Sequence, residues 1–231
     1  MTAPLSGPRL DPRGGAAKQL VVFLHGYGAD GNDLIELGRQ WRALLPEAAF
    51  VAPHAAERCV ASPTGRQWFP LSQTAPDDPR GADSRWRGAV AARPAIDAFL
   101  DAELARLGLD EKRLALIGFS QGTMMALHVG LRRKRAPAAI VGYSGLLVGP
   151  ERLGEATARD AKGAPPPILL VHGDQDPLIP VEAMFIAMDE LAEAKIPVQW
   201  HLAFGVGHGV DPEGLRHGGL FLAQAFGVRA R

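Results

Sequence analysis

Short apolar runs recur along the chain and end in glycine, proline or polar turns: residues 19–26, 48–53, 113–118, 138–144, 167–173 and 198–204. Most of these runs do not alternate apolar with polar residues, which is typical of strands buried on both faces of a parallel sheet. Patterns with helical spacing follow them, at residues 33–45, 86–107, 122–133, 181–194 and 213–226. Strands that alternate with helices predict an α/β fold, with a mostly parallel central sheet flanked by helices on both faces.

Three segments depart from this regular alternation. Pro94 lies inside the helical pattern of residues 86–107, so that helix is predicted to be kinked or to begin later. Residues 54–85 and 145–166 are too long to be simple connections. Irregular segments of this length in a compact domain usually line or cover a site, and we expect these two to do so.

The sequence predicts a single folded domain. Residues 1–17 are rich in proline and glycine and show no periodicity, which predicts a flexible leader or an edge segment; we assign 1–17 to a flexible leader and 18–231 to a single domain. The N-terminus lacks the apolar region of a signal peptide, and no apolar stretch is long enough to span a bilayer. A cytoplasmic protein without stable membrane insertion is therefore expected.

Composition excludes several classes of function. The 25 Lys and Arg residues cancel the 25 Asp and Glu residues, so no overall field favours nucleic acid as a partner. The single cysteine, Cys59, excludes a disulfide framework, and the acidic and histidine residues lack the spacing of metal ligands. We therefore predict no nucleic-acid partner, no metal and no cofactor.

The sequence "GFSQG", residues 118–122, places Ser120 where an apolar run ends and a helical pattern begins. A strand that turns directly into a helix crowds the backbone, so the positions two residues before and after the turn need glycine. Gly118 and Gly122 occupy these positions. Such a turn exposes the serine hydroxyl at the N-terminus of the helix, which predicts a nucleophile; the alternative is a helix-capping serine between packing glycines.

A serine nucleophile needs a base and an acid that orients the base, and with this turn they follow in the order serine, acid, histidine. His208 is the predicted base, because "FGVGHGVD" is a glycine-rich loop directly after a predicted strand. Asp174 and Asp176 compete for the acid in "HGDQDP". Pro177 holds Asp176 extended, which favours it only modestly, whereas Asp174 is typical of a turn residue that bonds its own backbone.

Two further groups complete the predicted site. The main-chain N–H groups of Gln121 and Tyr27 are expected to form an oxyanion hole, one directly after the nucleophile and the other in the first strand-to-helix loop. Trp68, Phe69 and Leu71 in "RQWFPL" are predicted to bind substrate as apolar walls; the alternative is that they anchor this segment to the core.

Four motifs in order, "FLHGYGAD", "GFSQG", "HGDQDPLIP" and "GVGHGVD", resemble the α/β-hydrolase family of small carboxylesterases, lysophospholipases and acyl-protein thioesterases. The resemblance implies an α/β-hydrolase fold without a large cap domain, and roles for Ser120 as nucleophile, Asp176 as acid and His208 as base. The choice of Asp176 over Asp174 rests on it. The resemblance also implies that Tyr27 and Gln121 are the oxyanion donors.

The chain departs from the family's pattern at three positions. Pro70 follows the Trp-Phe pair where the family often has aspartate, Tyr27 stands where leucine is common, and Thr123 where glycine is common. These positions bear on substrate shape and leave the implied triad intact.

The expected activity is that of a serine carboxylesterase that hydrolyses short- to medium-chain esters through an acyl-enzyme, with a small-molecule ester as its partner. An acyl-protein thioesterase or a lysophospholipase is the nearer alternative. A non-catalytic ligand-binding module on the same fold is the alternative from another class. Whether the protein forms a homodimer stays open.

Overall fold

The computed structural model describes residues 4–71, 79–157 and 164–228, and this part of the chain folds around a seven-stranded sheet. The strand order is β1-β3-β2-β6-β7-β8-β9, in which β1 is antiparallel to β3 and the other neighbours are parallel. The strands are β1 (Arg9–Leu10), β2 (Gln19–Leu24), β3 (Ala48–Val51), β6 (Leu114–Phe119), β7 (Ala139–Tyr143), β8 (Ile168–Gly173) and β9 (Val198–Ala203). The predicted α/β fold is confirmed.

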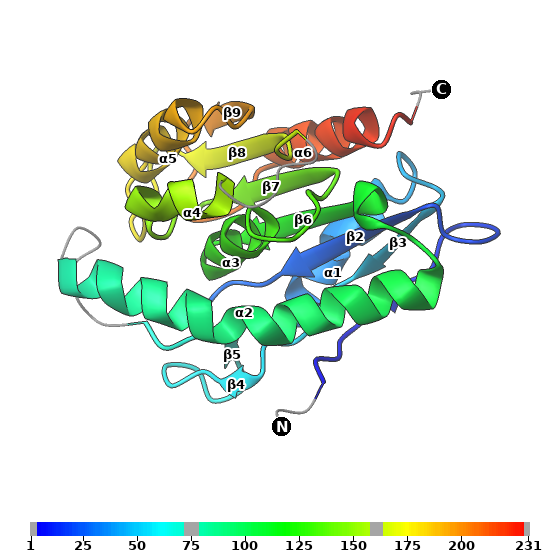
Figure 1. The fold of residues 1–231 in the computed structure, drawn as a ribbon, viewed down its shortest axis with the longest axis horizontal. Coiled ribbons are helices and arrows are strands. Elements are labelled where there is room, and N and C mark those ends of the chain that lie inside the picture. Colours follow the sequence, from blue (N-terminus) through cyan, green and yellow to red (C-terminus); the bar gives the residue numbers. More distant parts are fainter. Residues whose placement is uncertain (1–3, 72–78, 158–163, 229–231) are drawn as a thin grey trace.

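Helices cover both faces of the sheet (Figure 1). One face packs against α1 (Gly31–Trp41) and α6 (Pro212–Ala225), and the other against α2 (Pro79–Leu107), α3 (Gln121–Gly130) and α5 (Glu182–Glu193). Both faces of the central strands are therefore apolar, as in β2, where Leu20 and Val22 face one core and Val21 and Phe23 the other. This two-sided burial is the reason for the missing alternation in the sequence.

Smaller elements complete the fold. They are the two-stranded antiparallel β4 (Glu57–Arg58) and β5 (Arg66–Gln67), the short helix α4 (Leu153–Thr157), and 3-10 turns at Glu111–Arg113 and Pro150–Arg152. Within the described ranges, no large cap domain lies over the sheet. None of the described helices combines the length and the apolar character needed to cross a bilayer.

The flexible leader predicted for residues 1–17 is wrong for Arg9–Leu10, which form β1 at the edge of the sheet. Leu10 is buried against the core, and the Arg9 guanidinium pairs with Glu103 of α2. The edge-segment alternative describes these residues, because pairing with β3 satisfies their main-chain groups without any periodic pattern in the sequence.

The helix that contains Pro94 begins earlier than predicted, at Pro79, and continues through the proline (Figure 1). Proline removes the hydrogen bond to the carbonyl four residues before it, here Val90. Pro94 is exposed, and Val90 is 46% exposed, so water can solvate this carbonyl on the outer side of the helix. The helix therefore tolerates a proline that would break a buried one.

Candidate active site

The residues of the candidate site follow neighbouring strands at one edge of the sheet. Ser120 comes directly after β6, Asp176 follows β8, and His208 follows β9. Because these strands are parallel, their carboxyl ends meet at the same edge, where open α/β sheets bind ligands.

Ser120 sits on the sharp turn between β6 and α3, with a left-handed φ of 53°. A Cβ atom at Gly122 would lie 1.7 Å from the carbonyl oxygen of Leu24, and one at Gly118 would lie 2.3 Å from the main-chain nitrogen of Thr123. Only glycine fits at these two positions. Ser120 occupies the N-cap of α3, but its hydroxyl makes no capping hydrogen bond, so the capping alternative does not account for it.

The end of β7 holds this turn in place. The carbonyl of Tyr143 accepts hydrogen bonds from Ser120 N–H at 2.9 Å and from the Thr123 hydroxyl at 2.8 Å. Room for the Thr123 side chain comes from Gly142 and Gly145, where an added Cβ would lie within 2.5 Å and 2.3 Å of it. Thr123, which stands where glycine is common in the family, therefore helps to hold the turn of Ser120 in place.

Asp176 and His208 form the central contact of the site. Asp176 Oδ2 lies 2.7 Å from His208 Nδ1, and Asp176 Oδ1 accepts main-chain N–H bonds from Leu178 at 2.8 Å and Ile179 at 2.9 Å. Burial acts to raise the pKa of Asp176, but these N–H groups and His208 outweigh it and hold the pKa below its usual value. An ionised carboxylate fixes the proton of His208 on Nδ1, which leaves Nε2 to accept a proton.

Asp174 makes a different contact. Its Oδ1 accepts the N–H of Gly205 at 2.6 Å, in the loop between β9 and His208. Geometry therefore pairs His208 with Asp176, and Asp174 stabilises the loop that carries the histidine.

Two neighbours fix the imidazole and its acid. The rings of Phe119 and His208 have centroids 5.0 Å apart, which places the imidazole beside the residue that precedes Ser120. His172, fully buried at the end of β8, lies with Nε2 2.9 Å from Ile179 O and 3.3 Å from Asp176 Oδ2. His172 thus braces the turn that presents the acid, a role for which the sequence carries no separate signal.

The two predicted oxyanion donors come from separate elements. Gln121 is the first residue of α3, and a helix leaves the N–H of its first residue without a partner inside the helix. Tyr27 lies half-buried in the loop between β2 and α1, with its phenol near Cys59. Burial and the neighbouring Cys59 thiol raise the pKa of the phenol, so the side chain stays protonated.

A main-chain strap, residues 66–69, joins these two elements. Arg66 exchanges main-chain hydrogen bonds with Gly28 and Ala29 beside Tyr27. At the other end, the side-chain amide of Gln121 accepts a hydrogen bond from Trp68 N–H at 3.0 Å and donates one to Phe69 O at 2.7 Å. The strap therefore sets the spacing between the loop of Tyr27 and the N-terminus of α3.

The two aromatic side chains of the strap lie in the core. Trp68 and Phe69 are 5% and 2% exposed, and the Trp68 indole donates to His25 O at 2.9 Å. Leu71 is half-buried and packs against the same core. These contacts fit the alternative in which the three side chains anchor this segment to the core. That Trp68, Phe69 and Leu71 form walls of the substrate site stays a prediction.

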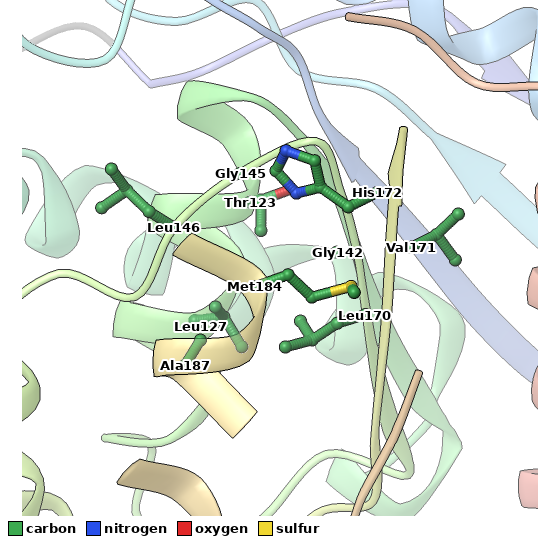
Figure 2. A pocket seen from close by; sticks show the side chains of 10 residues that line it. All are labelled: Thr123, Leu127, Gly142, Gly145, Leu146, Leu170, Val171, His172, Met184 and Ala187. Atoms are coloured by element: carbon green, nitrogen blue, oxygen red, sulfur yellow. The ribbon is translucent and has the colours of Figure 1, made fainter. Parts of the chain in front are cut away.

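Two hollows lie close to the triad. A groove of about 210 Å³ opens between the loop of Tyr27, α1 and the loop of His208, lined by Gly26, Ala29, Asp33, Leu34, Phe119, Gly209 and Val210. A cavity of about 10 Å³ lies beneath the nucleophile turn, among α3, β8 and α5 (Figure 2). It is lined by Thr123, His172 and apolar side chains such as Met184 and Leu170, and holds at most about one water. Of these two hollows, the larger groove is therefore the one that substrate can enter.

Of the two long irregular segments, the structure describes residues 54–71, 79–85, 145–157 and 164–166, while 72–78 and 158–163 lie outside the described residues. Leu147, Val148 and Leu153 of the second segment are buried in the core. The described part of this segment thus packs on the sheet, and its expected place over the site stays a prediction.

Comparison with known proteins gives a consistent result. A family model described as phospholipase/carboxylesterase matches residues 7–225. The chain is 31% identical over 183 residues to acyl-protein thioesterase 1 of Schizosaccharomyces pombe, covering 78% of each chain. It is 28% identical over 196 residues to esterase YpfH of Escherichia coli, covering 84% of this chain and 78% of the other. The crystal structure of esterase PE8 matches with a TM-score of 0.89 and 43% identity, over 96% of this chain and 100% of that one.

Proposed function

This chain belongs to the phospholipase/carboxylesterase family and is a serine hydrolase that acts on ester bonds, and we propose that Ser120, Asp176 and His208 carry out the hydrolysis. The observation that carries the assignment is the 2.7 Å contact between His208 and Asp176, beside a strained serine turn that only glycines permit. These are the three groups that acyl transfer to a serine requires.

Acylation begins when Ser120 Oγ attacks the acyl carbonyl and His208 Nε2 takes the hydroxyl proton. Asp176 stabilises the imidazolium through Nδ1, at the 2.7 Å contact. The Tyr27 and Gln121 N–H groups donate to the oxyanion, and the dipole of α3 favours the same charge. His208 then protonates the leaving alcohol. Water attacks the acyl-enzyme with His208 again as base, which regenerates Ser120.

The groove of about 210 Å³ supports a preference for short- to medium-chain esters. It is smaller than the roughly 300–1,000 Å³ typical of sites for drug-sized ligands, and most of its lining is apolar. Each extra methylene gains about 0.8 kcal/mol only while wall remains to cover it. A thioester can use the same machinery, and the S. pombe relative makes thioesterase activity the second candidate.

Ser120→Ala is expected to fold normally and to lose kcat by several orders of magnitude, because only binding and the oxyanion hole remain. The measurement is p-nitrophenyl acetate hydrolysis with labelling by a fluorophosphonate, which should mark the wild type alone. Ser6→Ala, the same change at an exposed serine, is the control and should retain full activity and labelling. Substantial ester hydrolysis by Ser120→Ala would refute the assignment.

Leu34→Phe tests the groove, because Leu34 lines it from α1 and a larger ring would shorten it. The kcat/KM of p-nitrophenyl esters should peak at short or medium acyl length in the wild type and at a shorter length in the variant. Leu37→Phe, on the same helix but outside the groove lining, should leave the profile unchanged. A steady rise out to palmitoyl esters, or the same profile in Leu34→Phe, would contradict this picture.

A further inference from the structure

Strand β7 contributes no member of the proposed triad, yet the residue directly after it has an unusual conformation. Ser144 is buried, at 1% exposure, and has a left-handed φ of 45°. Residues other than glycine rarely adopt this region, and such conformations persist where the surroundings enforce them, often at functional sites.

The hydrogen bonds of Ser144 hold its backbone in this left-handed conformation. Its N–H donates to Val171 O of β8 at 2.9 Å, and its hydroxyl donates to Gly209 O at 3.1 Å. Gly209 directly follows the catalytic histidine. The preceding residue, Tyr143, accepts the N–H of Ser120 through its carbonyl at 2.9 Å. Two consecutive residues at the end of β7 thus hold the nucleophile turn and the base loop.

The base loop, residues 205–209, depends on such anchors. Three of its five residues are glycines, which have no side chain to pack and the largest conformational freedom. On one side, Gly209 borders the groove of about 210 Å³, so no packed atoms support it there.

The two ends of the base loop are held by different groups. Before His208, the loop is tied to the segment after β8, where Gln175 N–H donates to Val206 O at 3.0 Å. After His208, the Ser144 hydroxyl holds the loop through the carbonyl of Gly209. Loss of that contact would release the C-terminal side of the histidine.

We propose that Ser144 is a positioning residue, whose hydroxyl fixes Gly209 and thereby holds His208 in register with Ser120. This inference rests on the proposed function, because it assigns His208 as the base. Ser144 itself contacts neither substrate nor the reacting atoms. Since small misplacements of a catalytic group slow the chemical step, its loss acts on kcat rather than on substrate binding.

The test compares Ser144→Gly with Ser144→Ala. Both remove the hydroxyl, but glycine also relieves the left-handed backbone, so Ser144→Gly should melt at or above the wild-type temperature. In both variants, kcat for p-nitrophenyl acetate and the rate of fluorophosphonate labelling should fall about 3- to 10-fold with KM unchanged, the size expected for one neutral hydrogen bond.

Lys195→Gly is the matched control. Lys195 is another residue with a left-handed φ, 58°, but it is exposed at the end of α5. Its replacement should raise thermal stability and leave kcat and labelling unchanged.

Two results would overturn the inference: a loss of less than about threefold in Ser144→Gly, or a loss in Ser144→Ala alone, which would implicate the backbone and not the hydroxyl. A wild-type protein that neither hydrolyses esters nor reacts with the fluorophosphonate would instead refute the proposed function, and the inference with it.

Discussion

Asp174 and Asp176 follow the same strand, yet their carboxylates hold different parts of one site. The Asp176 side chain is fully buried. One of its carboxylate oxygens contacts His208, and the other accepts hydrogen bonds from main-chain N–H groups of its own turn. Asp174 reaches across to Gly205, at the start of the loop that carries His208. In the proposed mechanism Asp176 stabilises the charge that forms on His208, whereas Asp174 stabilises a loop conformation.

Asp176→Asn should lower kcat by about 10⁴, because an amide can donate to Nδ1 and stabilise the wrong tautomer of His208. Asp174→Asn keeps an oxygen that can accept the Gly205 N–H, so its effect should fall mainly on stability, by about 0.5–1.5 kcal/mol. Steady-state kinetics and thermal unfolding of both variants separate the two roles. The reverse ranking of kcat would show that Asp174 is the acid.

The residues that could be predicted from sequence are those whose chemistry is local. Gly118 indicates the turn of Ser120 because the clash that it avoids, with Gly122 and Thr123, lies within the turn itself. Gly122 avoids a clash with Leu24 of β2, which only the folded chain brings close. Ser144 could not be found in this way, because its partner, Gly209, is 65 residues away along the chain. The side-chain role of Gln121 depends equally on Trp68, 53 residues before it, and only the folded chain brings the two together.

At the scale of elements, apolar runs of about six residues and helical patterns are sufficient for prediction, whereas two-residue strands are not. The strands from β2 to β9 in the main sheet and the helices α1, α3, α5 and α6 lie within a few residues of their predicted ranges. The two-residue strands β1, β4 and β5 leave no period to detect, since their formation depends on a partner strand. The continuation of α2 through Pro94 escapes prediction because the cost of this proline depends on its exposure, which the sequence does not reveal.

The strap of residues 66–69 shows how an element can serve a site without contributing a reacting group. Its aromatic side chains carry a signal for an apolar environment, which a substrate pocket and a core supply equally well. Trp68 and Phe69 are buried, and the strap's main chain connects the loop of Tyr27 with Gln121 at the start of α3, the two elements proposed to bind the oxyanion. A substitution such as Trp68→Ala would therefore disturb folding, at about 3–5 kcal/mol for an aromatic core residue, before it reported on substrate preference.

Across the whole molecule, buried histidines couple stability to pH. Burial lowers the pKa of His25, and burial with the nearby Arg132 and Arg93 lowers the pKa of His128 to about 3. The His128 ring lies edge-on to Trp86, and within the described ranges its Nδ1 has no hydrogen-bond partner. Both histidines therefore stay neutral in the folded protein at pH values where the unfolded chain is protonated.

His128→Leu should make the protein less sensitive to acid. In the wild type, the unfolded state binds more protons than the folded state between the ordinary histidine pKa of 6.5 and about 3, so stability present above pH 6.5 is lost as the pH falls through that window. The loss amounts to about 1 kcal/mol per pH unit for this one group. Urea unfolding at pH 8, 7, 6 and 5 should show a shallower decline in His128→Leu. Val129→Ala, a neighbouring core change without a titrating group, should lower stability by a similar amount at every pH. An equal decline in His128→Leu and the wild type would mean that His128 takes up its proton without unfolding.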